Sequence, residues 1–210
     1  MTQEELDRLL ATYGLGLLPG DTDFRPVDLS SQDLRGLSLA GLDLGRADLR
    51  WANLTGADLT EADLGEAILT GARLRDACFK GARLYGASLL GADLSGATFD
   101  GADLRYASLR FACFEGTSFR GIEGARLYAD SSRASMADFT GAKLYKANFW
   151  GADVTSACFE KADLTEATLS HGYLLSMRLD GAILPEEYRA TLRRCSKYSQ
   201  TTTLSMNHSR

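Results

Sequence analysis

The chain has 210 residues, of which 45% are hydrophobic and 24% are charged, and its formal net charge is −5. These values resemble those of an average globular domain and exclude a collagen-like or wholly disordered chain. The acidic total argues against direct nucleic-acid binding. No run approaches the ~20 apolar residues of a membrane span, so we expect no membrane insertion.

Residues 1–21 are predicted to form a short capping helix and a linker. Thr2 and Glu5 have the spacing of a capping box, and Gly14 is a suitable helix stop. The apolar stripe of this helix consists of Leu6, Leu9, Leu10 and Tyr13. We expect the helix to lie over the structure that follows and to shield its edge strands.

From residue 22 to residue 184 the sequence repeats every five residues. A large apolar residue forms the centre of each unit, Ala usually precedes it by two places, and Asp often lies between them, as in Ala47, Asp48 and Leu49. This period fits neither a helix nor simple strand alternation. It fits a short extended step followed by a corner, with Ala and Leu inside the coil and Asp bonded to nearby backbone donors.

Phenylalanine recurs every 20 residues, at Phe79, Phe99, Phe119, Phe139 and Phe159. Rings stacked from coil to coil along one wall would explain this clustering. Twenty residues per coil at five per side predict four sides.

Units such as 47–51, 57–61 and 102–106 resemble the A-(D/N)-L-x-x signature of the pentapeptide repeat family. The resemblance implies an all-β solenoid: a right-handed, quadrilateral β-helix of about eight coils with short N- and C-terminal α-helical caps. Among members of this family are dimeric, DNA-mimicking proteins that protect DNA gyrase.

The five-residue spacing breaks between Phe119 and Phe139. The centres there would be Gly124, Ala129 and Ala134, which are too small to fill the interior. We therefore expect an irregular coil or loop at 120–138, which is either a tolerated irregularity or a recognition loop.

The C-terminal region is predicted to contain a helix at 185–195 and a disordered tail at 196–210. Pro185 suits the first helical turn, Glu186 and Glu187 suit the positive end of the helix dipole, and the polar tail has no core pattern. The family resemblance implies a homodimer through the C-terminal coils, where apolar surface is added by Tyr173, Leu175 and Met177. The alternative is that the final helix only caps that end.

No catalytic, metal-binding or cofactor-binding constellation is evident, so we expect a protein that is not an enzyme. The outward aspartates suit a structural role, and His171 is an isolated corner residue. The spacing of Cys78, Cys113, Cys158 and Cys195 matches no zinc pattern. Reduced thiols and the absence of a secretory signal at the N-terminus predict a cytoplasmic location.

One side of the predicted coil, here called the Trp face, has its centres at residues 49, 69, 89, 109 and 149. Its outward apolar side chains form a candidate contact stripe of Trp51, Ile68, Leu90, Phe111 and Trp150. The alternative is that these side chains stack along the outside and only stiffen the rod.

The neighbouring side, called the Tyr face, has its centres at 84, 104 and 144 and alternates basic and aromatic residues. Its candidate contact residues are Arg83, Tyr85, Arg105, Tyr106, Lys143 and Tyr145, and Arg126 and Tyr128 are expected to extend it. Such a surface can bind a partner, or its members can pair with one another through cation–π contacts.

These features predict a rigid protein–protein interaction scaffold with an unidentified protein partner. The alternative is a DNA-mimicking inhibitor or protector of DNA gyrase or another topoisomerase, which the family resemblance suggests. Arg and Lys on every wall are unfavourable for such mimicry.

Overall fold

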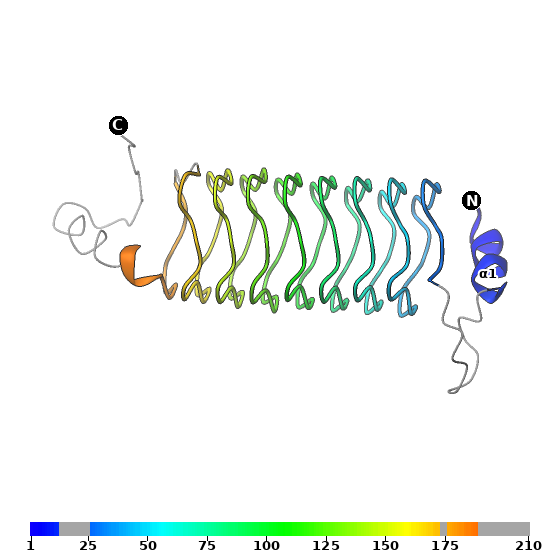
Figure 1. The fold of residues 1–210 in the computed structure, drawn as a ribbon, viewed down its shortest axis with the longest axis horizontal. Coiled ribbons are helices and arrows are strands. Elements are labelled where there is room, and N and C mark those ends of the chain that lie inside the picture. Colours follow the sequence, from blue (N-terminus) through cyan, green and yellow to red (C-terminus); the bar gives the residue numbers. More distant parts are fainter. Residues whose placement is uncertain (13–25, 173–175, 189–210) are drawn as a thin grey trace.

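The chain forms a rod-shaped solenoid with a helix at its N-terminal end (Figure 1). This computed structural model describes residues 1–12, 26–172 and 176–188. The helix, α1, spans Gln3–Thr12, and the coils are stacked side by side along the rod.

The coils are joined by parallel β-bridges between residues that lie 20 positions apart, beginning with Asp28 and Asp48. The next bridges follow at steps of five residues, so that one coil contributes four bridge positions. Each side is therefore a single extended step without a longer strand. The structure confirms the four-sided coil that the sequence predicts.

The repeat places its apolar residues inside and turns the backbone at the corners. Ala47 and Leu49 are fully buried, while Asp48 between them points outward and accepts a hydrogen bond from the backbone N–H of Arg50 at 3.1 Å. The corner residue that follows, Trp51, has a φ of 60°. The equivalent corner of the next coil has Gly71, with a φ of 67°, a region that glycine adopts without strain.

Helix α1 contacts the first coils through Gln3 and buries Leu6 and Leu10. Thr2 and Glu5 form the reciprocal capping box, with N···O distances of 2.7 and 3.2 Å. Gln3 uses its side-chain amide to donate to the carbonyl of Ser38 and to accept from the N–H of the same residue, each at 3.0 Å. The side-chain amide of Gln3 thus makes the two hydrogen bonds that the backbone of another coil would make to Ser38. It therefore satisfies part of the exposed edge of the first coil.

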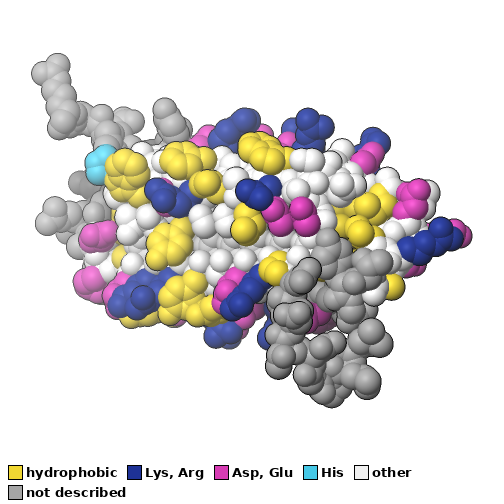
Figure 2. All heavy atoms as spheres, turned by 45° about the vertical axis from the view of Figure 1, so that its right-hand side comes forward, with side chains coloured by type: hydrophobic (Ala, Val, Ile, Leu, Met, Phe, Trp, Pro, Cys, Tyr) yellow, Lys and Arg dark blue, Asp and Glu magenta, His cyan; other side chains and the backbone are white. Residues whose placement is uncertain are grey.

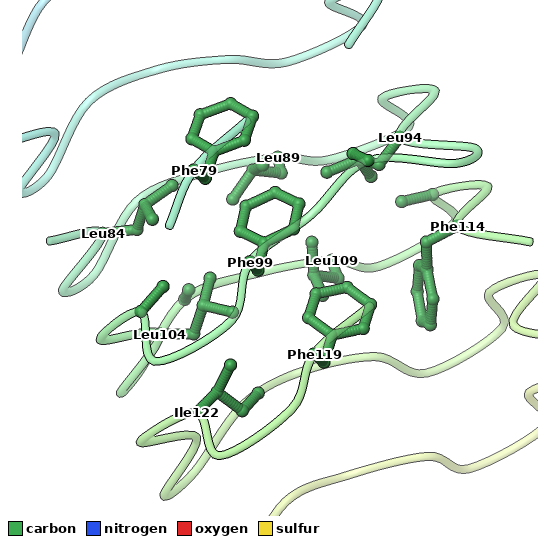
Figure 3. Packing of buried hydrophobic residues seen from close by; sticks show 14 of the residues in the cluster. Phe79, Leu84, Leu89, Leu94, Phe99, Leu104, Leu109, Phe114, Phe119 and Ile122 are labelled. Carbon is green, nitrogen blue, oxygen red and sulfur yellow. The ribbon is translucent and has the colours of Figure 1, made fainter. Parts of the chain in front are cut away.

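The interior contains the predicted ladder of stacked phenylalanines (Figure 3). Four successive ring pairs have centroids 4.4–5.1 Å apart and planes within 17° of parallel. Phe114 and Phe149 lie edge-on to the ladder, for example 5.5 Å from Phe149 to Phe139.

The predicted irregular coil or loop at 120–138 is wrong, because the bridges continue without interruption through Glu123, Tyr128 and Arg133. Large and small side chains have exchanged places within the units: Ile122 and Leu127 are fully buried where Ala is usual. They compensate for the small residues at the centres.

Neighbouring coils supply the rest of the missing volume. Phe114 precedes Ala134 by one coil and Phe149 follows Ala129 by one coil, and both rings pack edge-on against Phe139. The interior is therefore filled, and no bulge is required.

At the C-terminal end, residues 186–188 are helical and follow Pro185. Tyr188 is buried and donates its N–H to the carbonyl of Pro185 at 3.1 Å. Met177 is only 2% exposed, so it does not provide the apolar surface expected of a dimer interface.

Several sequence predictions lie outside the described residues. They are the helix stop at Gly14, Tyr173 and Leu175 of the expected dimer surface, the continuation of the helix to residue 195, and the tail at 196–210.

Candidate interaction surface

The Trp face presents one exposed large hydrophobic side chain on each of its successive coils from residue 49 to residue 150. These side chains are 38–65% exposed, and they are Trp51, Ile68, Leu90, Phe111, Tyr128 and Trp150. Figure 2 shows hydrophobic side chains along the length of the rod, with Lys and Arg side chains between them. Among the described residues, the other exposed large hydrophobics are Met136 on a different side and Tyr85, Tyr106, Tyr145 and Ile183 on the Tyr face.

Tyr128 belongs to this stripe and not to the Tyr face, which corrects the sequence prediction. It bridges Ser108 and Asn148, both of which lie on the Trp face. Tyr128 lies within the expected irregular segment at 120–138, where the sequence predicts a break in the five-residue spacing.

Trp51 lies flat against the backbone of the next coil. A Cβ atom added to Gly71 would lie 2.2 Å from the indole Cζ3 atom, so the ring needs glycine beneath it. The indole nevertheless remains 65% exposed, which leaves most of its surface available for contact.

A polar contact anchors the C-terminal half of the stripe. Asp130 is only 7% exposed and accepts from Arg110 Nε at 2.9 Å and from Asn148 Nδ2 at 3.5 Å. The guanidinium carbon of Arg110 lies 5.7 Å from the centroid of the Phe111 ring, and Trp150 lies one coil beyond Asp130. Arginine, tryptophan and other aromatic residues are enriched at the centres of protein interfaces.

On the Tyr face, by contrast, the basic and aromatic side chains pair with one another, as one of the two interpretations of the sequence predicts. The cations of Arg105, Arg126 and Lys146 lie 5.0–5.7 Å from the ring centroids of Tyr85, Tyr106 and Tyr145, respectively. Tyr85 and Tyr106 also contact each other, with ring centroids 5.4 Å apart.

Carboxylates neutralise most of the same cations. Ion pairs of 2.5–3.4 Å join Arg83 to Asp63, Arg105 to Asp103, Lys143 to Glu123 and Lys146 to Glu166. The hydrogen bond from Arg105 holds the pKa of Asp103 below its usual value, and the bonds from Lys146 and Tyr145 lower the pKa of Glu166. The Tyr face is thus a network of internal pairs, with little unpaired positive charge.

Two further features are absent from the described part of the chain. It contains no group of three or more His, Cys, Asp or Glu side chains placed to hold a metal ion. None of its helices has the length and apolar character that crossing a bilayer requires. Cys78, Cys113 and Cys158 have free thiols.

Comparison with known sequences identifies the repeat. A family model of pentapeptide repeats matches eight copies, over residues 47–84, 82–121 and 135–170. The chain belongs to the pentapeptide repeat family. No curated protein matches this pentapeptide repeat protein significantly.

Solved structures of the family are similar in fold. Two trypsin-treated variants of QnrB1, a plasmid-mediated fluoroquinolone resistance protein, have TM-scores of 0.56 and 0.57 and are 20% and 19% identical to this chain. In each case the similarity covers 82% of this chain and 94% or 93% of QnrB1. HetL from the cyanobacterium Nostoc sp. strain PCC 7120, a pentapeptide repeat protein involved in heterocyst differentiation regulation, is 29% identical, with a TM-score of 0.38 over 89% of this chain and 94% of HetL. At these levels the QnrB1 structures support the β-solenoid fold alone.

Proposed function

We propose that this pentapeptide repeat protein is a non-enzymatic scaffold in the cytoplasm that binds another protein through its Trp face. The observation that carries the proposal is the stripe of one exposed hydrophobic side chain on each successive coil, with the ion pair of half-exposed Arg110 and buried Asp130 in its C-terminal half. The Tyr face lies beside it and would form the rim of the contact.

The number of side chains in the stripe matters for affinity. Burying one large apolar side chain contributes ~1.5–3 kcal/mol, whereas association costs ~4–15 kcal/mol in lost motion. One or two exposed aromatics would not offset this cost, but six side chains on a rigid rod can. Because coils rise by ~4.8 Å, the partner would contact a stripe of roughly 24 Å.

The proposal is tested by affinity capture with the purified chain as bait and quantitative mass spectrometry. The double variant Trp51→Ala/Trp150→Ala removes the two ends of the stripe, and Met136→Ala is the matched control. Met136 is as exposed as Trp51, at 65%, but lies on a different side of the rod. We expect the double variant to lose specific partners at least tenfold and the control to retain them.

Since all three side chains are exposed, both variants should melt at the temperature of the wild type, which checks that the fold is intact. The proposal is wrong if the wild type and the double variant capture the same proteins in the same amounts. Homodimerisation is measured separately, by light scattering on the full chain.

The alternative function, inhibition or protection of DNA gyrase by DNA mimicry, has weaker support. A DNA mimic needs a continuously acidic surface, but every side of this rod carries both signs, and none departs from neutrality by more than two charges over residues 28–181. A supercoiling assay with purified gyrase and a quinolone, at micromolar protein, tests it. Inhibition or protection there would favour the alternative over the Trp-face scaffold.

A further inference from the structure

The Tyr face has a hollow of about 480 Å³ near its N-terminal end. Its floor includes Gly45 and Gly65, and Arg83, Tyr85 and Arg105 line its C-terminal side. Both glycines occupy the position directly after the centre of their unit. On the next two coils the same position is occupied by Tyr85 and Arg105. The two glycines are therefore positions on the face itself, whereas most other glycines of the repeat occupy the corners, where φ is positive.

The hollow lies at the N-terminal end of a column of stacked side chains. The backbones of Gly45, Gly65, Tyr85 and Arg105 follow one another on successive coils, as the bonds from the N–H of Arg46 to Gly65 O and from the N–H of Glu66 to Tyr85 O show. Tyr85 is covered from the following coil by Arg105 and Tyr106. On the preceding coil the matching residue is Gly65, which has no side chain to place against the ring.

The charges around the hollow are already paired. Arg46 binds Glu66 at 3.0 Å, Arg83 binds Asp63 at 3.4 Å, and Arg105 binds Asp103 at 2.6 Å. Three cations therefore face three anions, and neither a phosphate nor an ammonium group would find an unpaired counter-charge. An uncharged ring would disrupt no ion pair, would stack on Tyr85 and would gain a cation–π contact with a neighbouring guanidinium.

We propose that this hollow binds one aromatic side chain, a Trp or Tyr, of a protein partner. The ring would occupy the empty place over Gly65 and extend the column of Tyr85 and Arg105 by one member. This inference rests on the proposed function only for the source of the ring, because the hollow and its preference for an uncharged planar group are features of this chain.

The test is a titration of the full ¹⁵N-labelled chain with N-acetyl-tryptophanamide, followed by the amide signals in NMR spectra. We expect saturable shifts, with a dissociation constant in the millimolar range, at the amides of Gly45, Gly65 and Tyr85. Benzoate and N-acetyl-argininamide, whose planar groups themselves carry a charge, serve as competitors, and we expect at least tenfold weaker binding of each.

Two variants locate the binding. Gly65→Tyr would fill the hollow with the chain's own ring and should raise the dissociation constant at least tenfold. Its new Cβ would lie 3.2 Å from Asp63 Oδ1, a contact that a small shift of the carboxylate relieves. Thr165→Tyr, at the same place in a unit five coils away, is the matched control and should leave binding unchanged. Tyr85→Ala removes an exposed ring instead of adding one and should also weaken binding.

The inference fails if the shifts do not saturate, if they spread over the Trp face, or if either charged probe binds the same amides more tightly than the indole. Because the titration contains no partner protein, its failure would leave the affinity-capture result on the Trp face unaffected. Conversely, loss of the Trp-face function would not alter the titration.

Discussion

The coils of residues 100–119 and 120–139 follow the same path with different interiors. In the first, pairs such as Ala107 and Leu109 repeat the usual order of a small and then a large residue. In the second, Ile122 precedes Gly124, and the order of sizes is reversed. The comparison indicates that the bridges and corners set the register of the solenoid, and that the interior needs the correct total volume more than a particular residue at each centre.

The largest expected effect comes from removing the ring at the centre of the exchanged packing. Phe139 contacts Phe119, Phe159, Phe149 and Phe114, with centroids at 4.8–6.3 Å. Phe139→Ala should lower the free energy of unfolding by about 3–5 kcal/mol. Urea denaturation followed by circular dichroism measures this loss.

Phe79→Ala is the matched control for this prediction. Among the phenylalanines that the structure describes, Phe79 stacks on Phe99 alone, because the preceding coil has Leu59 at that position. Each aromatic pair adds ~0.5–1.5 kcal/mol beyond burial, so the control should lose at least ~1 kcal/mol less. Equal losses would mean that the rings around Ala129 and Ala134 do not compensate for the small centres.

A second prediction restores the usual order of sizes in the exchanged coil. Ile122→Ala alone leaves a cavity and should cost about 2–5 kcal/mol. Gly124→Leu alone overpacks the interior, since even a Cβ at Gly124 would lie 2.9 Å from Leu144 Cδ2 and 3.2 Å from Ile122 Cδ1, and should cost about 1–3 kcal/mol.

The double variant Ile122→Ala/Gly124→Leu recreates the Ala–Leu pair of the other coils. We expect its stability to lie within about 1.5 kcal/mol of the wild type, so that the two changes are strongly non-additive. Additive losses in urea denaturation would show that this coil depends on the particular shapes of its residues and not on their summed volume.

Most of the fold follows from the sequence, because the five-residue spacing decides which residues face inward. Residue type and position alone are sufficient to predict three features of the fold. These are the buried pair of Ala47 and Leu49, the ladder of phenylalanines from Phe79 to Phe159 and the capping box at Thr2. The exchange at Ile122 and Gly124 was missed because a pattern of residue types does not record volume donated by a neighbouring coil. The sequence does contain evidence of this exchange, because Ile122 and Leu127 are large residues at positions that Ala usually occupies.

The candidate surfaces were predictable only in part. The sides on which Trp51 and Tyr85 lie follow from counting, but Tyr128 lies beyond the point where the spacing breaks and was assigned to the wrong side. The hollow at Gly45 and Gly65 does not follow from the five-residue pattern, because these two glycines lie one residue before the corner, on the face itself. Ion pairs depend on side-chain rotamers, which residue spacing does not determine.

A third prediction compares the ion pair that joins coils 100–119 and 120–139 with an ion pair between two earlier coils. Arg110 and Asp130 connect the coils through a carboxylate that is 9% exposed, whereas Arg46 and Glu66, also 20 residues apart, are 63% and 56% exposed. A double-mutant cycle with Ala should give a coupling energy above about 1 kcal/mol for the first pair and below about 1 kcal/mol for the second. Arg110→Ala should cost more than Asp130→Ala, because it leaves the buried carboxylate without its cation.

The surface pair within coil 100–119 gives the smallest expected effect, which depends on pH. The hydrogen bond from Arg105 lowers the pKa of Asp103 below its value in the unfolded chain, so ionised Asp103 favours folding. This contribution is complete above the unfolded pKa of ~3.9 and is lost as the pH falls through the lower pKa of the folded state. Because Arg105 is half exposed, the contribution of this ion pair to the free energy of unfolding should not exceed ~1 kcal/mol. The difference between the melting temperatures of the wild type and Asp103→Asn should therefore be largest at pH 6 and should shrink as the pH falls towards 2 and Asp103 becomes protonated. A difference that persists unchanged at pH 2 would show that the amide disturbs packing, and that the ion pair does not stabilise this coil.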